Sequence, residues 1–148
     1  MSTTTPTFSP AVLGQTEKAL NAILDRQLAG TGLTERHWIT LTLTVVSGGT
    51  VDRDELVARV AGGLKVNEAE AQSLIDELAA ARLVQASEDE GSLVKLTDSG
   101  QLLHSQIRAG VTQITERMWG DLPDEDLATA GRVLSTVLER ANAELAAA

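Results

Sequence analysis

The sequence contains no cysteine and few aromatic side chains: two Trp, one Phe and no Tyr in 148 residues. Without cysteine the chain has no disulfide, no thiol catalysis and no zinc site of the cysteine type, and nothing in it demands an oxidising compartment. We therefore expect a cytoplasmic protein. With so few aromatics, the core must be built from Leu, Val, Ile and Ala, which suits packed helices better than an aromatic-rich β-sandwich.

Long hydrophobic runs are also missing. The longest apolar stretches fall far short of the roughly 20 residues that a membrane span needs, and the first ten residues lack the basic start and apolar run of a signal peptide. We expect no contact with a membrane. Residues 1–9 are predicted to be a disordered lead, and residues 10–148 a single winged-helix domain, a length that suits one hydrophobic core.

Signatures of catalysis and of metal or nucleotide binding are absent from the sequence. There is no Ser-His-Asp signature, and two histidines without cysteine make a poor transition-metal site. The pairs Gly48-Gly49 and Gly62-Gly63 lack the spacing and the lysine of a phosphate-binding loop. They are interpreted as helix stops. We therefore assign no catalytic residue, no metal ligand and no cofactor, and expect a protein other than an enzyme.

Apolar residues recur at helical spacing in the N-terminal third of the chain. One amphipathic helix is predicted from Pro10 to the glycines at 30 and 32. Thr34 is a good cap for a second helix, although its centre is rich in β-branched threonine, which leaves a strand as the alternative. Its predicted core positions are Trp38, Leu41, Val45 and Val46.

The segment 51–96 carries the signals of a helix-turn-helix followed by a hairpin. Asp52 with Glu55, and Asn67 with Glu70, have the spacing of capping boxes and predict two short helices, the second over residues 67–81. Two short helices around a brief turn form a helix-turn-helix. The apolar runs 83–86 and 93–96 flank a polar loop containing glycine, which predicts a β-hairpin or wing.

The remaining segments predict helices that need a partner. Thr97 caps a long helix that ends at Gly120, and Pro123 opens the last helix. The apolar stripes of the terminal helices are longer than the segment 51–96 can cover. Residues 10–47 and 97–148 are therefore predicted to form the helical dimerisation region of a homodimer. The predicted fold is mainly α, a winged helix-turn-helix with a small β-hairpin wing.

This order of elements, from about Val12 to Leu145, resembles the MarR family of bacterial winged helix-turn-helix transcriptional regulators. The resemblance implies a homodimer that binds pseudo-palindromic double-stranded DNA, with each recognition helix in a major groove and each wing near the minor groove. It also implies a small phenolic or other aromatic acid bound where the dimer and DNA-binding lobes join. The matching motifs are Gly32-Leu33-Thr34 before Trp38, Asp54-Glu55-Leu56, Leu74 to Leu78 followed by Leu83-Val84, and Leu96-Thr97-Asp98-Ser99-Gly100.

The charge of the segment 51–96 departs from the family pattern. It holds five basic and ten acidic residues, a net charge of −5 in a chain of net charge −9. Arg82 stands where the family usually has glycine, and the wing tip 87–91 has no positive charge. This acidity opposes binding to DNA. An alternative is a MarR-like fold that has lost DNA binding and serves as a small-molecule-binding protein, an enzyme or an acidic protein-binding module.

Candidate DNA contacts are few, because no basic residue lies between Asn67 and Ala81. Base edges and phosphates are met by side chains such as Arg, Lys, Asn and Gln. Glu68 and Glu70 are interpreted as stabilising the positive end of the helix. Arg53 and Arg59 are further candidates for phosphate contact, unless these cations only pair with neighbouring acids. The predicted DNA-binding residues are Lys65, Asn67, Gln72, Ser73, Arg82 and Lys95.

A ligand site is predicted between the second and fifth helices. His104 and Arg108 are four residues apart and share a helix face, which meets His37 and Trp38 if the two helices adjoin. Arg108 would bind a carboxylate, a histidine a phenol, and Trp38 or Trp119 an aromatic ring. The alternative is that Trp38 is core and the histidines are ordinary helix residues. If the site exists, a bound aromatic or anionic ligand would favour a spacing of the dimer's two DNA-binding lobes (its heads) that no longer fits two successive major grooves.

Overall fold

The computed structural model describes residues 6–86 and 92–147. The chain divides into two compact units, Met1–Val111 and Thr112–Ala148. The predicted architecture, mainly α with a small antiparallel sheet, is confirmed. The elements are α1 (Pro10–Leu28), α2 (Glu35–Val46), β1 (Thr50–Asp52), α3 (Arg53–Leu64), α4 (Glu68–Ala80), β2 (Val84–Gln85), β3 (Leu93–Leu96), α5 (Asp98–Trp119) and α6 (Asp124–Ala146).

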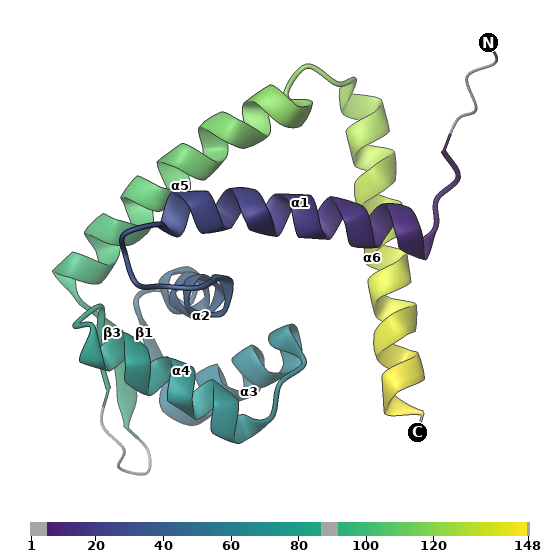
Figure 1. The fold of residues 1–148 in the computed structure, drawn as a ribbon. Coiled ribbons are helices and arrows are strands. Elements are labelled where there is room, and N and C mark those ends of the chain that lie inside the picture. The colour runs from purple at the N-terminus through teal and green to yellow at the C-terminus, as the bar shows by residue number, and fades with distance from the viewer. Residues whose placement is uncertain (1–5, 87–91, 148) are drawn as a thin grey trace. The chain divides into compact units, whose positions relative to one another are not determined.

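Helix α2 is the central element of the first unit. It lies between α1 and the pair formed by α3 and α4, and it contacts all three (Figure 1). The core between these helices and the sheet consists of aliphatic side chains, as the composition predicts. Fully buried members include Leu41, Leu56, Val60, Ile75 and Val94.

The buried face of α2 differs from the predicted one: it includes two threonines and leaves out one of the predicted valines. Thr40 and Thr44 are completely buried, whereas Val46 is 66% exposed, so its predicted core position is wrong. The Oγ1 atom of Thr40 donates to the Arg36 carbonyl at 2.9 Å, and that of Thr44 donates to the Thr40 carbonyl at 3.0 Å. These bonds along the helix satisfy the buried hydroxyls, and the segment is a helix rather than the alternative strand.

The predicted caps of α3 and α4 are present. The Oδ1 atom of Asp52 accepts from the backbone N–H groups of Asp54 and Glu55, and the Oδ1 atom of Asn67 accepts from the N–H of Glu70 at 2.8 Å. These bonds occupy N–H groups that a helix start leaves without a partner. Helix α4 therefore begins directly after Asn67, as the sequence predicts.

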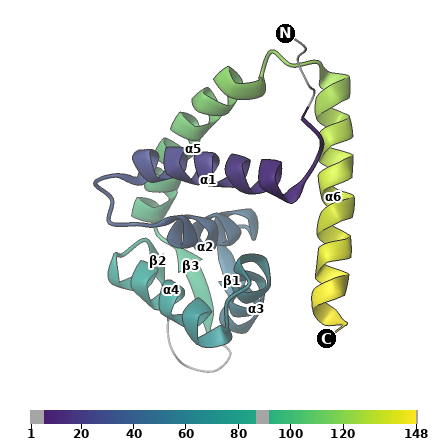
Figure 2. The same cartoon turned by 45° about the vertical axis from the view of Figure 1, so that its right-hand side comes forward.

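The sheet has three antiparallel strands in the order β1, β3, β2 (Figure 2). Val51 is opposite Val94, and Val84 is opposite Leu96. The hairpin of β2 and β3 confirms the predicted wing, whose acidic tip at 87–91 lies outside the described residues. Strand β1 was not predicted, because three residues between a glycine pair and a helix cap give no alternating pattern.

The start of α5 is fastened to the chain that leaves α4. The hydroxyl of Thr97 accepts from the N–H of Gly100 at 3.0 Å and lies 2.7 Å from the Arg82 carbonyl oxygen. A Cβ atom on Gly100 would collide with the carbonyl oxygen of Leu83. The glycine therefore permits the close approach of helix and strand that this junction requires.

The second unit consists of the end of α5 and the whole of α6. Pro123 directly precedes α6, as predicted, and no residue of α6 is buried. Its apolar stripe is left open by the described part of this single chain: Leu134, Leu138 and Leu145 are each more than 40% exposed. Across residues 6–86 and 92–147, no helix is both long and apolar enough to span a membrane.

Candidate functional site

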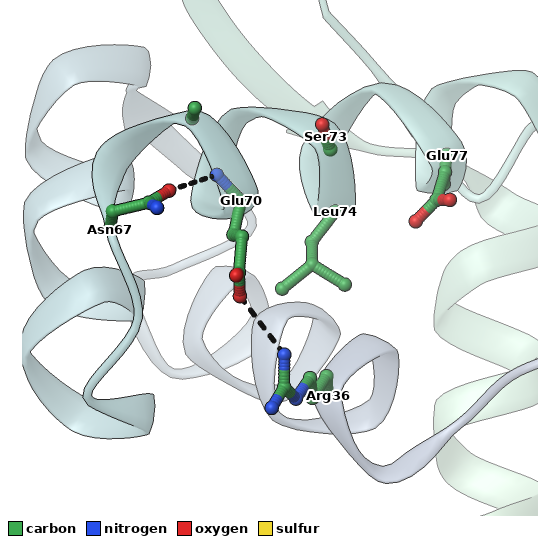
Figure 3. Close-up of a pocket in the computed structure, with 7 residues that line it drawn as sticks. Arg36, Asn67, Glu70, Ser73, Leu74 and Glu77 are labelled. Carbon is green, nitrogen blue, oxygen red and sulfur yellow. Dashed lines mark hydrogen bonds and ion pairs between the residues drawn. The ribbon is translucent and has the colours of Figure 1, made fainter.

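Helix α4 buries one face and presents a short polar face outward. Ala71, Leu74, Ile75 and Leu78 face the core. The opposite side carries small or neutral side chains with one carboxylate, and in Figure 3 Ser73 points away from Leu74. The exposed residues of this outward face are Ala69, Gln72, Ser73, Asp76 and Ala80.

Three of the four carboxylates on α4 bind side chains from other helices. Glu70 pairs with Arg36 of α2 at 3.0 Å, as Figure 3 shows. Asp76 pairs with Arg53 of α3 at 2.9 Å. The Oε2 atom of Glu77 is 2.9 Å from Nε2 of His37.

These bonds draw the carboxylates of α4 toward α2 and α3. Three of the ten acidic residues of segment 51–96 therefore have a partner within the first unit, although each of these carboxylates remains about half exposed to solvent. Glu68, in the first turn, lies near the positive end of the helix, where a carboxylate is stabilising.

Arg53 is buried, with only 9% of its side chain exposed, and its partner is Asp76. The prediction that Arg53 meets a phosphate is therefore wrong. Since Asp76 lies 23 residues away in sequence, no local pattern marks this pair. Arg59 is exposed and donates to the hydroxyl of Ser47 at 2.8 Å.

Two of the predicted phosphate-binding residues flank α4 in the left-handed backbone conformation. Lys65, just before α4, has φ 59°, and Arg82, just after it, has φ 63°. Both side chains are exposed. Glycine adopts this conformation most easily, and other residues are uncommon there. The glycine that the family usually has in place of Arg82 thus has a conformational reason.

Lys95 completes the predicted set on the exposed side of β3. It is opposite Thr50 on β1 and Gln85 on β2. The structure therefore places Asn67, Gln72 and Ser73 on the exposed side of α4, Lys65 and Arg82 at its two ends, and Lys95 in the sheet.

A pocket of about 360 Å³ lies beside the N-terminal half of α4 (Figure 3). Arg36 enters it from α2 and Asn67 from the start of α4. Arg36 was not predicted as a site residue, because its partner Glu70 is 34 residues away and meets it only after α2 packs on α4. The lining residues are Arg36, Asn67, Ala69, Glu70, Ser73, Leu74 and Glu77.

Trp38 and His104 stack face to face in the first unit. Their ring centroids are 4.6 Å apart and the ring planes differ by 11°. Nε2 of His104 is 3.2 Å from the hydroxyl of Thr42. Burial and the nearby Arg108 guanidinium both lower the pKa of His104. The structure thus brings together Trp38, a neutral His104 and Arg108, three of the four predicted ligand residues.

His37, the fourth, faces α4 instead. Its Nδ1 accepts from the backbone N–H of Thr34 at 3.0 Å, which caps α2, and its Nε2 therefore carries the proton donated to Glu77. Because both ring nitrogens have partners within the protein, His37 is separated from the stack of Trp38 and His104. It fastens α2 to α4.

No family model matches the sequence, and no curated protein matches it. Solved structures do share its fold. A MarR protein from Peptoclostridium difficile is 19% identical, with 97% of this chain and 95% of that chain covered and a TM-score of 0.76. A MarR-family transcriptional regulator from Rhodococcus sp. RHA1 is 22% identical, with coverage of 85% and 90% and a TM-score of 0.71.

A third similar structure is that of CouR from Rhodococcus jostii RHA1 bound to p-coumaroyl-CoA. It is 21% identical to this chain, covers 85% of it and 88% of its own length, and gives a TM-score of 0.70. All three align over most of both chains. The chain therefore has the winged-helix fold of the MarR-family transcriptional regulators.

Proposed function

We propose that this protein is a ligand-responsive, DNA-binding regulator of transcription that acts as a homodimer. The observation that carries the proposal is the placement of charge around α4. Arg36, His37 and Arg53 hold three of its carboxylates, and Lys65 and Arg82 stand at its two ends. A helix-turn-helix with this distribution meets DNA through a face whose carboxylates mostly have partners within the protein, between two cations.

The contacts follow from this arrangement. Gln72 and Ser73 meet base edges in the major groove, Asn67 a base or phosphate at the start of α4, and Lys65, Arg82 and Lys95 phosphates. The two left-handed cations favour this role. Glycine would suit the backbone better at both positions, so a basic side chain there is best explained by what its charge contacts.

The stack of Trp38 and His104 is the proposed ligand site. An aromatic ring can pack against Trp38, His104 can exchange a hydrogen bond with a phenol, and Arg108 can bind a carboxylate. The similar CouR structure with p-coumaroyl-CoA supports an aromatic acid derivative as the chemical class.

Helix α2 connects this ligand site to the recognition helix. Trp38 directly follows Arg36 and His37, which bond to Glu70 and Glu77 of α4. A ligand that displaces Trp38 therefore acts on α4 through two adjacent residues. It shifts the population between head spacings that fit DNA and those that do not.

The homodimer is supported by the open apolar stripe of α6. A second copy of the chain is the proposed cover, because a two-fold dimer buries the same face on both partners. Two copies also supply two recognition helices for a pseudo-palindromic operator.

A fluorescence-anisotropy titration against the DNA upstream of the protein's own gene tests the proposal. With about three phosphates neutralised per subunit, affinity should fall roughly 10³-fold between about 50 and 200 mM salt. Absence of binding at the lower salt concentration would reject the regulator and favour the alternative that DNA binding has been lost.

The variants Lys65→Gly and Arg82→Gly separate a DNA contact from a structural role. Glycine suits both backbones, so the free energy of unfolding should stay within about 1 kcal/mol of the parent's. DNA affinity should fall, and the salt slope should decrease by about one for each phosphate that is no longer neutralised. Lys18→Ala on α1 is the matched control and should leave both quantities unchanged.

A further inference from the structure

The outward face of α4 limits which bases it can recognise, an inference that rests on the proposed function. Arg and Lys are the usual partners of guanine N7 and O6, and no Arg or Lys lies between residues 67 and 81. Gln and Asn pair with adenine N6 and N7, and alanine packs against the methyl group of thymine. The exposed side of α4 offers these latter types in Ala69 and Gln72.

The two arginines nearest this face are held by carboxylates of α4, and the buried Arg53 is bonded to Asp76. The Arg36 guanidinium is bonded to Glu70, and Figure 3 shows Ser73 pointing to the other side of α4. Lys65 and Arg82 lie beyond the two ends of the helix. The middle of α4 therefore meets DNA without the Arg or Lys that pairs with both N7 and O6 of guanine.

The carboxylates that would accept from the cytosine amino group are mostly engaged. Glu70, Asp76 and Glu77 bind Arg36, Arg53 and His37. Glu68, in the first turn, is the carboxylate of α4 for which the described residues show no such pair. Cytosine recognition is thus confined to the start of the helix.

Gln72 and Asn67 differ in what they can offer to adenine. The Oδ1 atom of Asn67 already accepts from the Glu70 N–H, which fixes the amide at the start of the helix and uses one of its two acceptor lone pairs. Gln72 is exposed in the second turn, and its amide can both donate to adenine N7 and accept from N6. We infer that the second turn of α4 reads adenine and thymine edges, with Gln72 as the adenine-specific residue, and that α4 makes no bidentate Arg or Lys contact with guanine.

The test begins with selection of binding sites from randomised duplexes at about 50 mM salt. The selected half-site should have A·T pairs where α4 enters the major groove. Replacing the contacted adenine with 7-deazaadenine, which lacks N7, should weaken binding about 5- to 100-fold. Replacing a guanine that α4 contacts with 7-deazaguanine should weaken binding less than the 7-deazaadenine replacement does, because α4 has no Arg or Lys to pair with guanine N7 and O6.

Gln72→Ala should lower affinity for the selected site and abolish its sensitivity to 7-deazaadenine. Gln106→Ala, an exposed glutamine on α5, is the matched control and should retain that sensitivity. A large loss with 7-deazaguanine would overturn the inference while leaving DNA binding intact, and an unchanged 7-deazaadenine effect in Gln72→Ala would overturn the role of Gln72. If no duplex is enriched, both this inference and the proposed function fail.

Discussion

Three consecutive residues of α2 connect the two regions to which function is assigned. Arg36 and His37 bind Glu70 and Glu77 on α4, while Trp38 stacks on His104 of α5. Successive residues on a helix point about 100° apart, so one turn of α2 faces both neighbours. The proposed ligand site and the proposed recognition helix therefore share a single rigid element, and His37 belongs to the connection between them.

His104 should make stability depend on pH. Its pKa in the folded protein lies below the ordinary histidine value of 6.5, because of burial and then Arg108. Below about pH 6.5 the unfolded chain therefore binds a proton that the folded chain does not, and stability falls as pH falls. The limiting slope is about 1.4 kcal/mol per pH unit.

Urea unfolding between about pH 5 and 8 measures this dependence. The informative quantity is the difference from His104→Gln, which should show a shallower slope below pH 6.5. Equal slopes in the two proteins would show that His104 does not remain neutral in the fold.

At the residue scale, sequence predicts local interactions and misses those made by tertiary packing. The caps at Asp52 and Asn67 were predictable because donor and acceptor lie within three residues. The Arg36 and Arg53 pairs join residues 34 and 23 apart, and only the docked helices bring them together. His37 contacts α4, whereas His104 of α5 stacks on Trp38. This difference likewise depends on which helix packs against each face of α2.

At the scale of elements, the junction of α5 with the wing predicts a strict requirement for glycine. Gly100→Ala would place a Cβ against the Leu83 carbonyl oxygen, a backbone atom that cannot turn aside. We expect a loss of about 1–3 kcal/mol in the free energy of unfolding, as for other overpacked sites.

Gly62→Ala on α3 is the matched control for this substitution. No heavy atom lies within 4 Å of its added Cβ, so alanine should leave stability unchanged or raise it by about 0.5–1 kcal/mol. Chemical denaturation of both variants gives the comparison. Similar stability of Gly100→Ala and the parent would mean that α5 can move away from the wing at little cost.

Elements with a full apolar period were predicted almost to the residue, and the shortest was missed. Helix α4 has four buried positions at helical spacing, which set its extent unambiguously. Strand β1 has three residues, and it is held by pairing with β3, more than 40 residues along the chain. Strand β1 forms because β3 of the wing pairs with it, so residues 50–52 alone do not predict a strand.

At the scale of the whole molecule, the proposed dimer can be broken through α6 alone. Leu134→Glu with Leu138→Glu places two carboxylates on its open apolar stripe, and size-exclusion chromatography with light scattering should then report a monomer. Thr136→Glu, outside the stripe, should remain a dimer. Since two heads are needed for an operator, the monomeric variant should also lose high-affinity DNA binding. A parent protein that is monomeric at micromolar concentration would contradict the dimer.

The left-handed backbone at Lys65 and Arg82 has a consequence for directed evolution of this protein. A library selected for heat resistance alone should accumulate glycine at both positions, because the backbone favours it there. Under the proposed function, these variants would be more stable but would bind their operator more weakly. Selection on repression or activation of a reporter gene should instead keep both basic residues. The two selected libraries should therefore differ first at positions 65 and 82.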